Sequence, residues 1–353
     1  MNAQVDDPYS VFVSNGEVFI ADTGNHRVRK LLRNGQIVSI AGDGNKGYNG
    51  DDQLATDSQL YYPMGVVVSS SNQVYISEKS RIRKIDQRGI ISTIAGTGEE
   101  GYNGDDKLAV DAQLSGPRGL FVTDDEEVYF CDLTNHSVRK IDRHGMISTI
   151  AGNGMKGYNG DDILATSAQL RFPSSVFVFK NEIYIADTGN HRIRKVLQNG
   201  VIKTIAGAGV KEYTVDDQPP IHSQAWYCYG IWVHNDCVYF SDHYNNRIWM
   251  ILPNGMIKTI IVKNRAGNGS QFVHPSGIFV DDSGIYFCCN YDSRIRKVDP
   301  NGTITTIIGT SKYGYSGDVP FDFEKYPHIG PRKKQLIKPF PRALYDIAIQ
   351  INK

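Results

Sequence analysis

The hexapeptide GYNGDD at residues 47–52 recurs without change at residues 101–106 and 157–162. Degenerate copies stand at residues 212–217 (EYTVDD) and 314–318 (GYSGD). The chain is therefore built on an internal repeat of roughly 55 residues. A regular period of this order is typical of solenoids and propellers, in which one supersecondary unit is stacked many times.

Each unit begins with glutamine, an apolar residue, two variable residues and, in most cases, proline. The starts with this pattern are QVDDP at 4, QLYYP at 59, QLSGP at 113, QLRFP at 169, QFVHP at 271 and QLIKP at 335. The unit that starts at Gln224 has lost the proline. Four short segments rich in Val, Ile, Phe, Tyr and Thr follow each start, with turns such as Asn34-Gly35 and Asn199-Gly200 between them. This composition is typical of antiparallel strands joined by tight hairpins.

The four segments predict an all-β fold, a six-bladed β-propeller of four-stranded antiparallel blades. The first two segments are almost continuously apolar, as in strands covered on both faces. The six complete units cover residues 4–58, 59–112, 113–168, 169–223, 224–270 and 271–334 within a single domain, residues 1–353. Residues 335–353 begin a seventh unit and stop after its first strand. We expect them to close the ring against the first blade, unless the chain is a fragment of a longer protein.

A second motif lies after the second predicted strand of each unit. Its fullest copies are ADTGNHRVRKL at residues 21–31 and ADTGNHRIRKV at residues 186–196. These segments resemble the signature of the NHL repeat, and the stretch from TIAG through GYNGDD to AQL resembles the long-linker NHL repeats of bacterial proteins and teneurin-like ectodomains. The resemblance implies a six-bladed propeller. It implies no single activity, because such propellers include protein-binding, RNA-binding and enzymatic members.

The charge balance argues against two classes of partner. Lysine and arginine number 38, as do aspartate and glutamate, so no net field attracts nucleic acid or a charged membrane. No apolar run approaches the roughly 18 residues of a membrane span, and the first residues lack the pattern of a signal peptide. We therefore expect a monomer that engages neither a membrane nor nucleic acid.

The five cysteines, at positions 131, 228, 237, 288 and 289, lack the spacing of a metal site. Cys131 and Cys288 stand where other units have alanine or serine, so we expect small buried thiols. A disulfide between Cys288 and Cys289 is the alternative. This usage favours a reducing, cytoplasmic compartment, although the sequence leaves the location open.

The aspartate pairs of GYNGDD could hold a cation or could serve the fold alone. They are Asp51, Asp52, Asp105, Asp106, Asp161 and Asp162. Propeller topology gathers them on one face with Asp216, Asp217, Asp318, His26, His136 and His191. Because carboxylates suit calcium and imidazoles suit zinc, calcium is one interpretation. We favour no cofactor: DDQLATDSQL and its copies predict a short helix capped by aspartate, worth about 1 kcal/mol, with the Tyr48 ring buried between blades.

The motif residues have structural interpretations as well. The histidines come from different blades, so each is expected to make a hydrogen bond and not to share a metal ion. Asp22 and Asp187 are expected to fix their turns or to pair with Arg27 and Arg192. The segments Arg27-Val-Arg29-Lys30 and Arg192-Ile-Arg194-Lys195 could bind RNA phosphates. Their recurrence in almost every unit instead suggests a solvated outer strand.

The fifth unit departs most from the repeat, because it carries all three tryptophans and its linker has lost GYNGDD. We expect a non-catalytic scaffold that binds a protein, or a glycan or small ligand, through one loop face. The candidate contact residues are Trp226, Tyr227, Tyr229 and His243, since tyrosine and tryptophan are favoured binding anchors. Aromatic packing inside the fold is the alternative interpretation of these side chains.

Two other functions compete with a scaffold. One is an RNA-binding propeller, and the other is a metal-dependent lyase or hydrolase resembling the amidating lyases. Those lyases place a metal-binding histidine in the proline turn of the first strand, where this chain reads PYS, PMG, PRG, PSS and PSG. His222 and His274 are the nearby candidates. The sequence leaves the question of an enzyme open and leans towards none.

Overall fold

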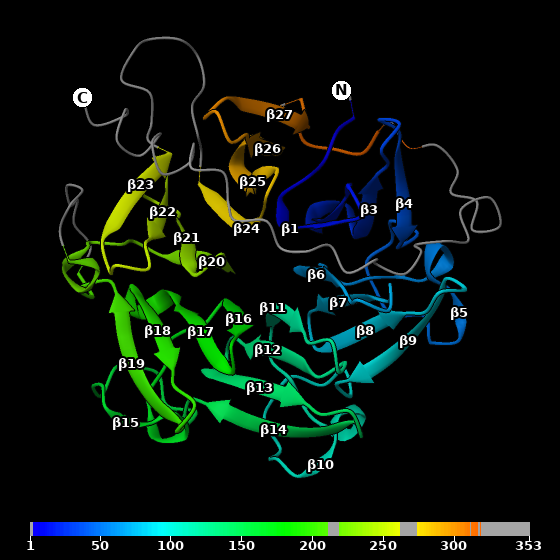
Figure 1. Cartoon of the computed structure of the whole chain (residues 1–353). Coiled ribbons are helices and arrows are strands. Elements are labelled where there is room, and N and C mark those ends of the chain that lie inside the picture. The colour runs from blue at the N-terminus through cyan, green and yellow to red at the C-terminus, as the bar shows by residue number, and fades with distance from the viewer. Residues whose placement is uncertain (1–2, 211–218, 262–273, 311, 317, 319–353) are drawn as a thin grey trace.

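The computed structural model describes residues 3–210, 219–261, 274–310, 312–316 and 318. These residues form six antiparallel sheets that surround a central axis like the blades of a wheel (Figure 1). The predicted six-bladed β-propeller is confirmed. Within these ranges no helix has the length and apolar character needed to cross a bilayer.

Each blade starts at the axis and ends at the rim, and its four main strands follow one another in chain order. The first three blades contain β1 (Pro8–Ser14), β2 (Glu17–Asp22), β3 (Arg27–Leu31) and β4 (Ile37–Ala41); β6 (Gly65–Val68), β7 (Val74–Glu78), β8 (Arg81–Ile85) and β9 (Ile90–Ala95); β11 (Pro117–Val122), β12 (Val128–Asp132), β13 (Ser137–Ile141) and β14 (Met146–Ala151). The last three contain β16 (Ser175–Phe179), β17 (Glu182–Asp187), β18 (Arg192–Val196) and β19 (Val201–Ala206); β20 (Cys228–His234), β21 (Cys237–Asp242), β22 (Arg247–Ile251) and β23 (Ile257–Ile261); β24 (Pro275–Asp281), β25 (Gly284–Cys289), β26 (Arg294–Val298) and β27 (Ile304–Ile308).

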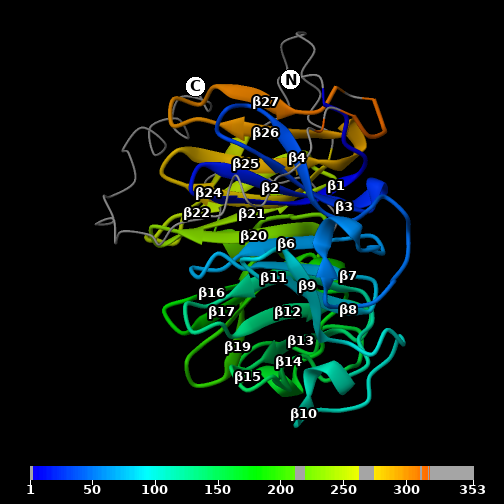
Figure 2. The same ribbon diagram turned by 90° about the vertical axis from the view of Figure 1, so that its right-hand side faces the viewer.

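The ring is closed by packing between the inner strands. These strands contact one another in the order β1, β6, β11, β16, β20 and β24, and β24 contacts β1 again. In the side view the strands run across the thickness of the wheel (Figure 2). The innermost strand of every blade therefore presents side chains to one shared central channel.

The hydrophobic core lies in the seams between blades. Each of the six apolar clusters joins two neighbouring blades, as Val28 of the first blade meets Ile76 of the second. The cluster that joins the last blade to the first includes Ile20 and Cys288. All five cysteines are buried and free, so Cys131 and Cys288 fill small slots as predicted and the alternative disulfide is wrong.

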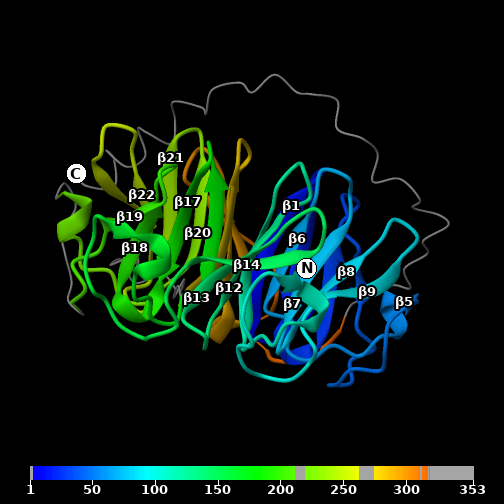
Figure 3. The same cartoon turned by 90° about the horizontal axis from the view of Figure 1, so that it is seen from below.

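The linkers after the first three blades differ from the prediction. Each adds a two-residue strand to the outer edge of the next blade: β5 (Gln53–Leu54) on β9, β10 (Lys107–Leu108) on β14 and β15 (Ile163–Leu164) on β19 (Figure 1). The view from below shows β5 beside β9 (Figure 3). Three blades thus have five strands where four were expected.

The predicted helix with an aspartate cap is wrong. A single 3₁₀ turn follows each extra strand, at η2 (Ala55–Asp57), η3 (Ala109–Asp111) and η4 (Ala165–Ser167), and no side chain caps it. Residues 53 and 54 are extended because they pair with β9, which overrides their local helical pattern. The other turns are η1 (Thr23–Asn25), η5 (Thr188–Asn190), η6 (Pro220–His222) and η7 (Asn290–Asp292).

The two faces of the propeller differ in the turns that they carry. The hairpin face carries the turns from first to second strand and from third to fourth strand, such as residues 15–16 and 32–36. The motif face carries the turns from second to third strand, such as residues 23–26, and the linkers between blades. The central channel connects these two faces.

The last linker reaches back to the first blade. Ser316 Oγ accepts a hydrogen bond from the Gln4 amide (3.1 Å), and the carbonyl of Gly314 accepts one from Asn25 (2.7 Å). The last linker thus docks on the first blade as the GYNGDD segments dock on the second, third and fourth blades. Residues 335–353, expected to close the ring, lie outside the described residues, as do Asp216 and Asp217.

Candidate functional site

The first aspartate of each GYNGDD binds an arginine buried in the following blade. In the second blade, Arg83 Nη2 donates to Asp51 (2.8 Å) and to the carbonyl of Gly50 (3.0 Å), while Nη1 donates to Glu78 (3.1 Å). The equivalent contacts are Arg139 with Asp105 (2.6 Å) and Asp132 (3.3 Å), Arg194 with Asp161 (2.9 Å) and Asp187 (3.4 Å), and Arg29 with Asp318 and Asp22 (3.3 Å). Each contact with a linker aspartate attaches that linker to the blade that follows it, and we call each such arginine–aspartate contact a staple.

This arrangement corrects two expectations about the arginines. Arg29 and Arg194 are fully buried, so the third strand is not a solvated stripe open to RNA phosphates. Asp22 and Asp187 fix their turns, as one alternative predicted, by accepting hydrogen bonds from Asn25 (3.0 Å) and Asn190 (2.8 Å). They pair with the buried Arg29 and Arg194, and the predicted pairs with Arg27 and Arg192 are wrong. The latter two side chains donate to backbone carbonyls of the linker instead.

The tyrosine of the hexapeptide also differs from the prediction. Tyr48 remains 41% exposed and is not buried in the seam. The Arg81 guanidinium lies over its ring at 3.8 Å from the centroid, and Arg192 covers Tyr158 in the same way at 3.9 Å. These rings form cation–π contacts on the rim, of the kind worth about 0.5–1 kcal/mol at exposed sites.

The aspartate pairs are engaged with the protein itself. Besides Arg83, the Asp51 carboxylate accepts a hydrogen bond from Thr93 Oγ1 (3.0 Å). Asp52 adopts a left-handed backbone (φ 58°), and its amide donates to the carbonyl of Ile91 (2.9 Å). In the described part of the chain, no three His, Cys, Asp or Glu side chains are grouped so that they could hold a metal ion. A guanidinium already stands where a cation would meet Asp51.

The motif histidines link neighbouring blades. His26, His136 and His191 each accept a backbone N–H at Nδ1, from Tyr62 (3.3 Å), Phe172 (3.3 Å) and Tyr227 (3.2 Å) respectively. Each hydrogen bond lies in a different seam. The histidines are therefore the hydrogen-bonded motif residues that were predicted.

In the fifth and sixth blades, different residues stand at the positions of the buried ion pair. In the fifth, Trp249 occupies the position of the buried arginine, and its Nε1 donates to Asp242 (2.9 Å). In the sixth, Cys289 stands at the position of the buried acid, and Arg296 pairs with Asp292 (2.6 Å). The linker before the fifth blade reads EYTVDD in place of GYNGDD.

The four predicted contact residues lie close together on the motif face. The Tyr229 and His243 rings are 4.6 Å apart, and Tyr227 lies 6.3 Å from Tyr229. Trp226 joins them through Tyr244, at 4.9 Å. His243 is only 3% exposed, so its ring is part of the packing and not of a contact surface. Whether the other three side chains bind a partner stays a prediction.

A second histidine stands against His243. The His274 ring lies 4.7 Å from the His243 ring, and each histidine has Nδ1 at 3.2 Å from a backbone carbonyl. Burial and the neighbouring His274 lower the pKa of His243 to about 4. His243 is therefore neutral in the folded protein at pH 6, whereas an exposed histidine in the unfolded chain titrates near 6.5.

We expect His243 to make the protein sensitive to acid. Protons bind only to the unfolded chain between about pH 6.5 and 4, so this residue alone should reduce the free energy of unfolding by about 3 kcal/mol over that range. His243→Thr is the matched control, because Thr188 fills the equivalent place and donates to a carbonyl (2.6 Å). We would measure the free energy of unfolding with urea at about pH 6.5 and at about pH 4. Between these values the variant should lose about 3 kcal/mol less than the wild type. Equal losses would contradict the expectation.

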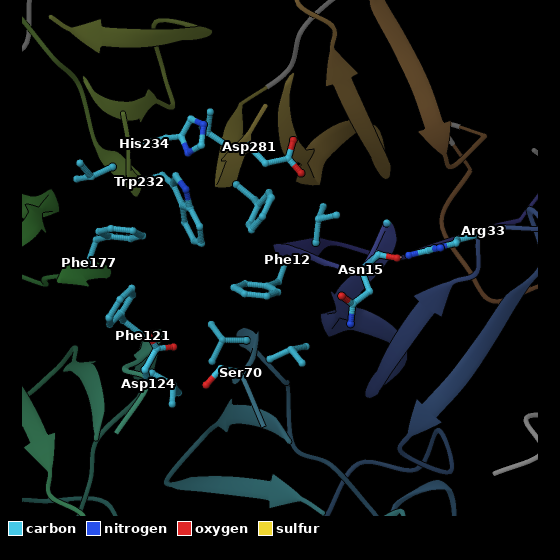
Figure 4. A pocket seen from close by; sticks show the side chains of 18 residues that line it. Phe12, Asn15, Arg33, Ser70, Phe121, Asp124, Phe177, Trp232, His234 and Asp281 are labelled. Atoms are coloured by element: carbon cyan, nitrogen blue, oxygen red, sulfur yellow. The ribbon is translucent and has the colours of Figure 1, made fainter. Parts of the chain in front are cut away.

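A cavity that we call the funnel lies where the central channel opens on the hairpin face (Figure 4). Its volume is about 1040 Å³. The six inner strands each contribute the residue at one equivalent position to its floor: Phe12, Val67, Phe121, Phe177, Trp232 and Phe279. Five of these are aromatic. We call these six residues the aromatic floor.

The floor rings pack against one another in tilted or edge-to-face pairs. Trp232 contacts Phe177 at 4.7 Å and Phe279 at 4.5 Å, and Phe121 contacts Phe177 at 4.7 Å. Phe12, Phe121 and Trp232 are only half-buried, so they present ring surface to the funnel. Such a wall of aromatic rings with open volume above it suits a ligand with an apolar part.

The channel is plugged below this floor. A remnant of only about 40 Å³ separates Phe12 and Trp232 from Tyr9 and Tyr229. Near the opposite mouth the Tyr9 hydroxyl accepts a hydrogen bond from Arg118 (2.7 Å), and the Tyr9 and Tyr229 rings are 5.8 Å apart. The funnel is therefore a pocket with a closed end and not a pore.

Polar side chains stand around the mouth of the funnel. They are Asn15, Arg33, Ser70, Asp124, His234 and Asp281 (Figure 4). His234 Nε2 lies 3.0 Å from Asp282, and Ser70 comes from the opposite side of the ring. These two side chains do not form a nucleophile and base pair.

Sequence reasoning missed this funnel, although a signal was present. The first apolar runs read SVFV, GVVV, GLFV, SVFV, GIWV and GIFV, and their third residue is aromatic in five of six units. An apolar strand buried on both faces requires no such choice. The recurrence of a large ring at one position indicates a shared place at the axis.

In a comparison with known protein families, the chain matches two family models, both of the NHL type. Residues 33–103 and 97–156 match the Teneurin NHL domain, and residues 10–31 and 170–196 match the NHL repeat. Teneurin-4 of Mus musculus is 30% identical over 223 residues, which cover 55% of this chain and 8% of that protein. The chain thus spans less than a tenth of this relative's length.

Two solved structures illustrate the range of similar folds. Virginiamycin B lyase from Staphylococcus aureus is 18% identical, with a TM-score of 0.52 over 87% of this chain and 86% of the lyase. An auxiliary nutrient binding protein from Bacteroides thetaiotaomicron is 13% identical, with a TM-score of 0.60 over 86% of this chain and 70% of that protein. At these identities the likeness shows the fold alone.

Proposed function

Because the chain belongs to the NHL-repeat β-propellers, we propose that it is a non-catalytic binding scaffold whose funnel on the hairpin face receives a small organic ligand. The observation that supports this proposal is the aromatic floor at the bottom of a closed-ended cavity of about 1040 Å³. Binding pockets for small molecules commonly have volumes of about 300–1,000 Å³ and mostly apolar walls. The fold does not decide the matter, since both a lyase and a nutrient binding protein share it.

The rigidity of the ring supports the same function. The floor residues lie on inner strands that are packed on both sides by neighbouring blades. Their rings are held by contacts with one another, as between Trp232 and Phe279. A pocket whose walls are fixed before the ligand arrives loses little conformational entropy on binding. The polar groups at the mouth can then orient the ligand.

Trp232→Val should weaken the binding of a neutral aromatic probe such as N-phenyl-1-naphthylamine by about tenfold or more, since burial of one aromatic surface is worth about 1.5–3 kcal/mol. Valine is the natural choice because Val67 fills the equivalent position in the second blade. Fluorescence titration measures the affinity.

Trp226→Val, on the motif face, is the matched control and should leave probe binding unchanged. If Trp232→Val has a much lower melting temperature than the wild type, Phe121→Val provides a second variant of the aromatic floor. Equal affinity in the wild type and both floor variants would refute the funnel as the binding site.

A protein partner is proposed for the motif face as a second contact. Tyr244 and Tyr291 are exposed beside the half-buried Trp226 and Tyr227, and such aromatic side chains are common binding anchors. A protein captured through this face would be lost in Trp226→Val and retained by Trp232→Val. The opposite pattern would remove this part of the proposal.

We also propose a cytoplasmic location. The five cysteines are buried and free, which suits a reducing compartment. Imaging of the full-length chain in its own cell tests this location, and an extracellular signal would contradict it.

A further inference from the structure

Two carboxylates at the funnel, Asp124 and Asp281, have no basic partner among the described residues. We propose that the ligand of the funnel is an organic cation, an amine or quaternary ammonium carried on an apolar stem. This inference rests on the proposed function of the funnel and names the chemical class of its ligand.

Most of the other acidic side chains around these hairpins have a lysine within ion-pair distance, and Asp282 lies beside His234. The pairs are Glu17–Lys30 (3.0 Å), Glu126–Lys84 (3.5 Å), Glu127–Lys140 (2.5 Å), Glu182–Lys195 (2.6 Å), Asp282–His234 (3.0 Å) and Asp236–Lys180. Lysines are thus available across this face, and they pair with acids beside the funnel. The two carboxylates that line the cavity keep their charge uncompensated.

The two carboxylates differ in their own contacts. Asp281 Oδ1 accepts hydrogen bonds from the amide of Ser283 (2.8 Å) and from its hydroxyl (2.6 Å). These bonds fix the side chain without neutralising it. Asp124 is exposed at the tip of its hairpin. The two acids flank the aromatic floor from different blades (Figure 4).

The aromatic floor adds a second attraction for the same charge. The faces of aromatic rings carry negative electrostatic potential, and tryptophan gives the strongest cation–π contact. Phe12, Phe121 and Trp232 are half-buried on the floor, and Asp124 and Asp281 stand on different sides of the same funnel (Figure 4). A cation seated on these rings would have carboxylates on two sides, and its apolar stem could cover the remaining rings.

One basic side chain of the lining, Arg33, opposes this preference. Its Nε donates to the carbonyl of Asn15 (2.6 Å), and the guanidinium lies at the outer edge of the mouth, away from the floor (Figure 4). His234 is held by Asp282. The fixed charges of the lining therefore comprise two carboxylates and one guanidinium, all at the mouth, and the guanidinium is already hydrogen-bonded to the Asn15 carbonyl.

Three probes with one stem test the inference: 3-phenylpropylamine, 3-phenylpropanol and 3-phenylpropionate, which are cationic, neutral and anionic at pH 7. Calorimetric titration of the full chain should show the amine binding about tenfold more tightly than the alcohol, and the carboxylate most weakly. The preference for the amine should decrease with added salt, because the mouth is open to solvent.

The double variant Asp124→Asn, Asp281→Asn should reduce the affinity for the amine towards that for the alcohol, with a smaller preference left by the aromatic rings, and leave the alcohol unchanged. Asparagine can keep the turn at position 281. Arg33→Gln should leave the amine bound at least as tightly. Equal affinities for amine and alcohol in the wild type would overturn the cation inference and leave the funnel as a binding site. Tightest binding of the carboxylate would also overturn it. Failure of all three probes to bind at millimolar concentration would overturn both the inference and the proposed function.

Discussion

Arg139→Leu should lower the free energy of unfolding by about 3–5 kcal/mol, the usual effect of removing one partner from a buried ion pair. Arg139 is fully buried in the third blade, where it donates to Asp132 (3.3 Å), Asp105 (2.6 Å) and the carbonyl of Gly104 (3.1 Å). Leucine leaves the Asp132 carboxylate buried without its cation and releases the linker from the blade. Urea unfolding at pH 7 measures the change.

Two further variants separate the contributions. Asp105→Asn should cost about 1 kcal/mol, because Asp105 is 28% exposed and asparagine can still accept a hydrogen bond. Arg139→Trp should be less harmful than Arg139→Leu, since Trp249 in the fifth blade donates to Asp242 from the same position. A loss below about 1 kcal/mol in Arg139→Leu would show that the staple contributes little.

The fold could be predicted from the sequence because each repeat unit contains strong local signals for strands and turns. Turn dipeptides such as Asn34-Gly35 fix the hairpins, and two apolar segments in each unit require cover on both faces. Neither signal depends on distant residues. A closed ring follows because each blade must bury its apolar faces against two neighbours.

The role of GYNGDD could not be predicted in the same way. Asp51 and Arg83 are 32 positions apart, and the aspartate belongs to the linker while the arginine belongs to the next blade. Local patterns favoured a capped helix, but pairing of Gln53 and Leu54 with β9 decided the conformation. A buried arginine looks the same as a solvated one in a sequence that alternates basic and apolar residues.

The contact residues predicted from the sequence lie on the motif face, whereas the proposed funnel opens on the hairpin face. Trp226, Tyr227, Tyr229 and His243 attracted attention because they cluster in the sequence of one unit. The aromatic floor takes one residue from each unit, about 55 positions apart along the chain. Only ring closure brings these residues together, so their shared role depends on the whole propeller.

The staple and the funnel are connected through the ring. Buried arginines hold the linkers to the second, third and fourth blades, and Arg29 binds Asp318 of the last linker to the first blade. These contacts fix the blades at the rim, whereas the floor rings fix them at the axis. A pocket assembled from six blades keeps its shape only while every seam stays closed. Stability of the rim therefore supports binding at the centre.

Gly152→Ala should destabilise the protein by about 4 kcal/mol or more, an unusually large effect for one methyl group. Gly152 follows β14, where its backbone has φ 91°, and its amide donates to the carbonyl of Ala165 (2.9 Å). An added Cβ would lie 2.3 Å from the carbonyl oxygen of His136. That oxygen is backbone at the turn before β13, so the strand itself would have to move.

Gly154→Ala is the matched control for this clash. Gly154 lies two residues further on with nearly the same backbone (φ 83°), but no atom lies within 4 Å of its added Cβ. It should therefore lose only the roughly 1–2 kcal/mol of a left-handed alanine. Thermal and urea unfolding of the two variants give the difference between a strained backbone and a blocked seam. Equal losses would mean that the approach of β14 to the His136 carbonyl is looser than the structure shows, and that the seam between the third and fourth blades can adjust without disturbing the ring.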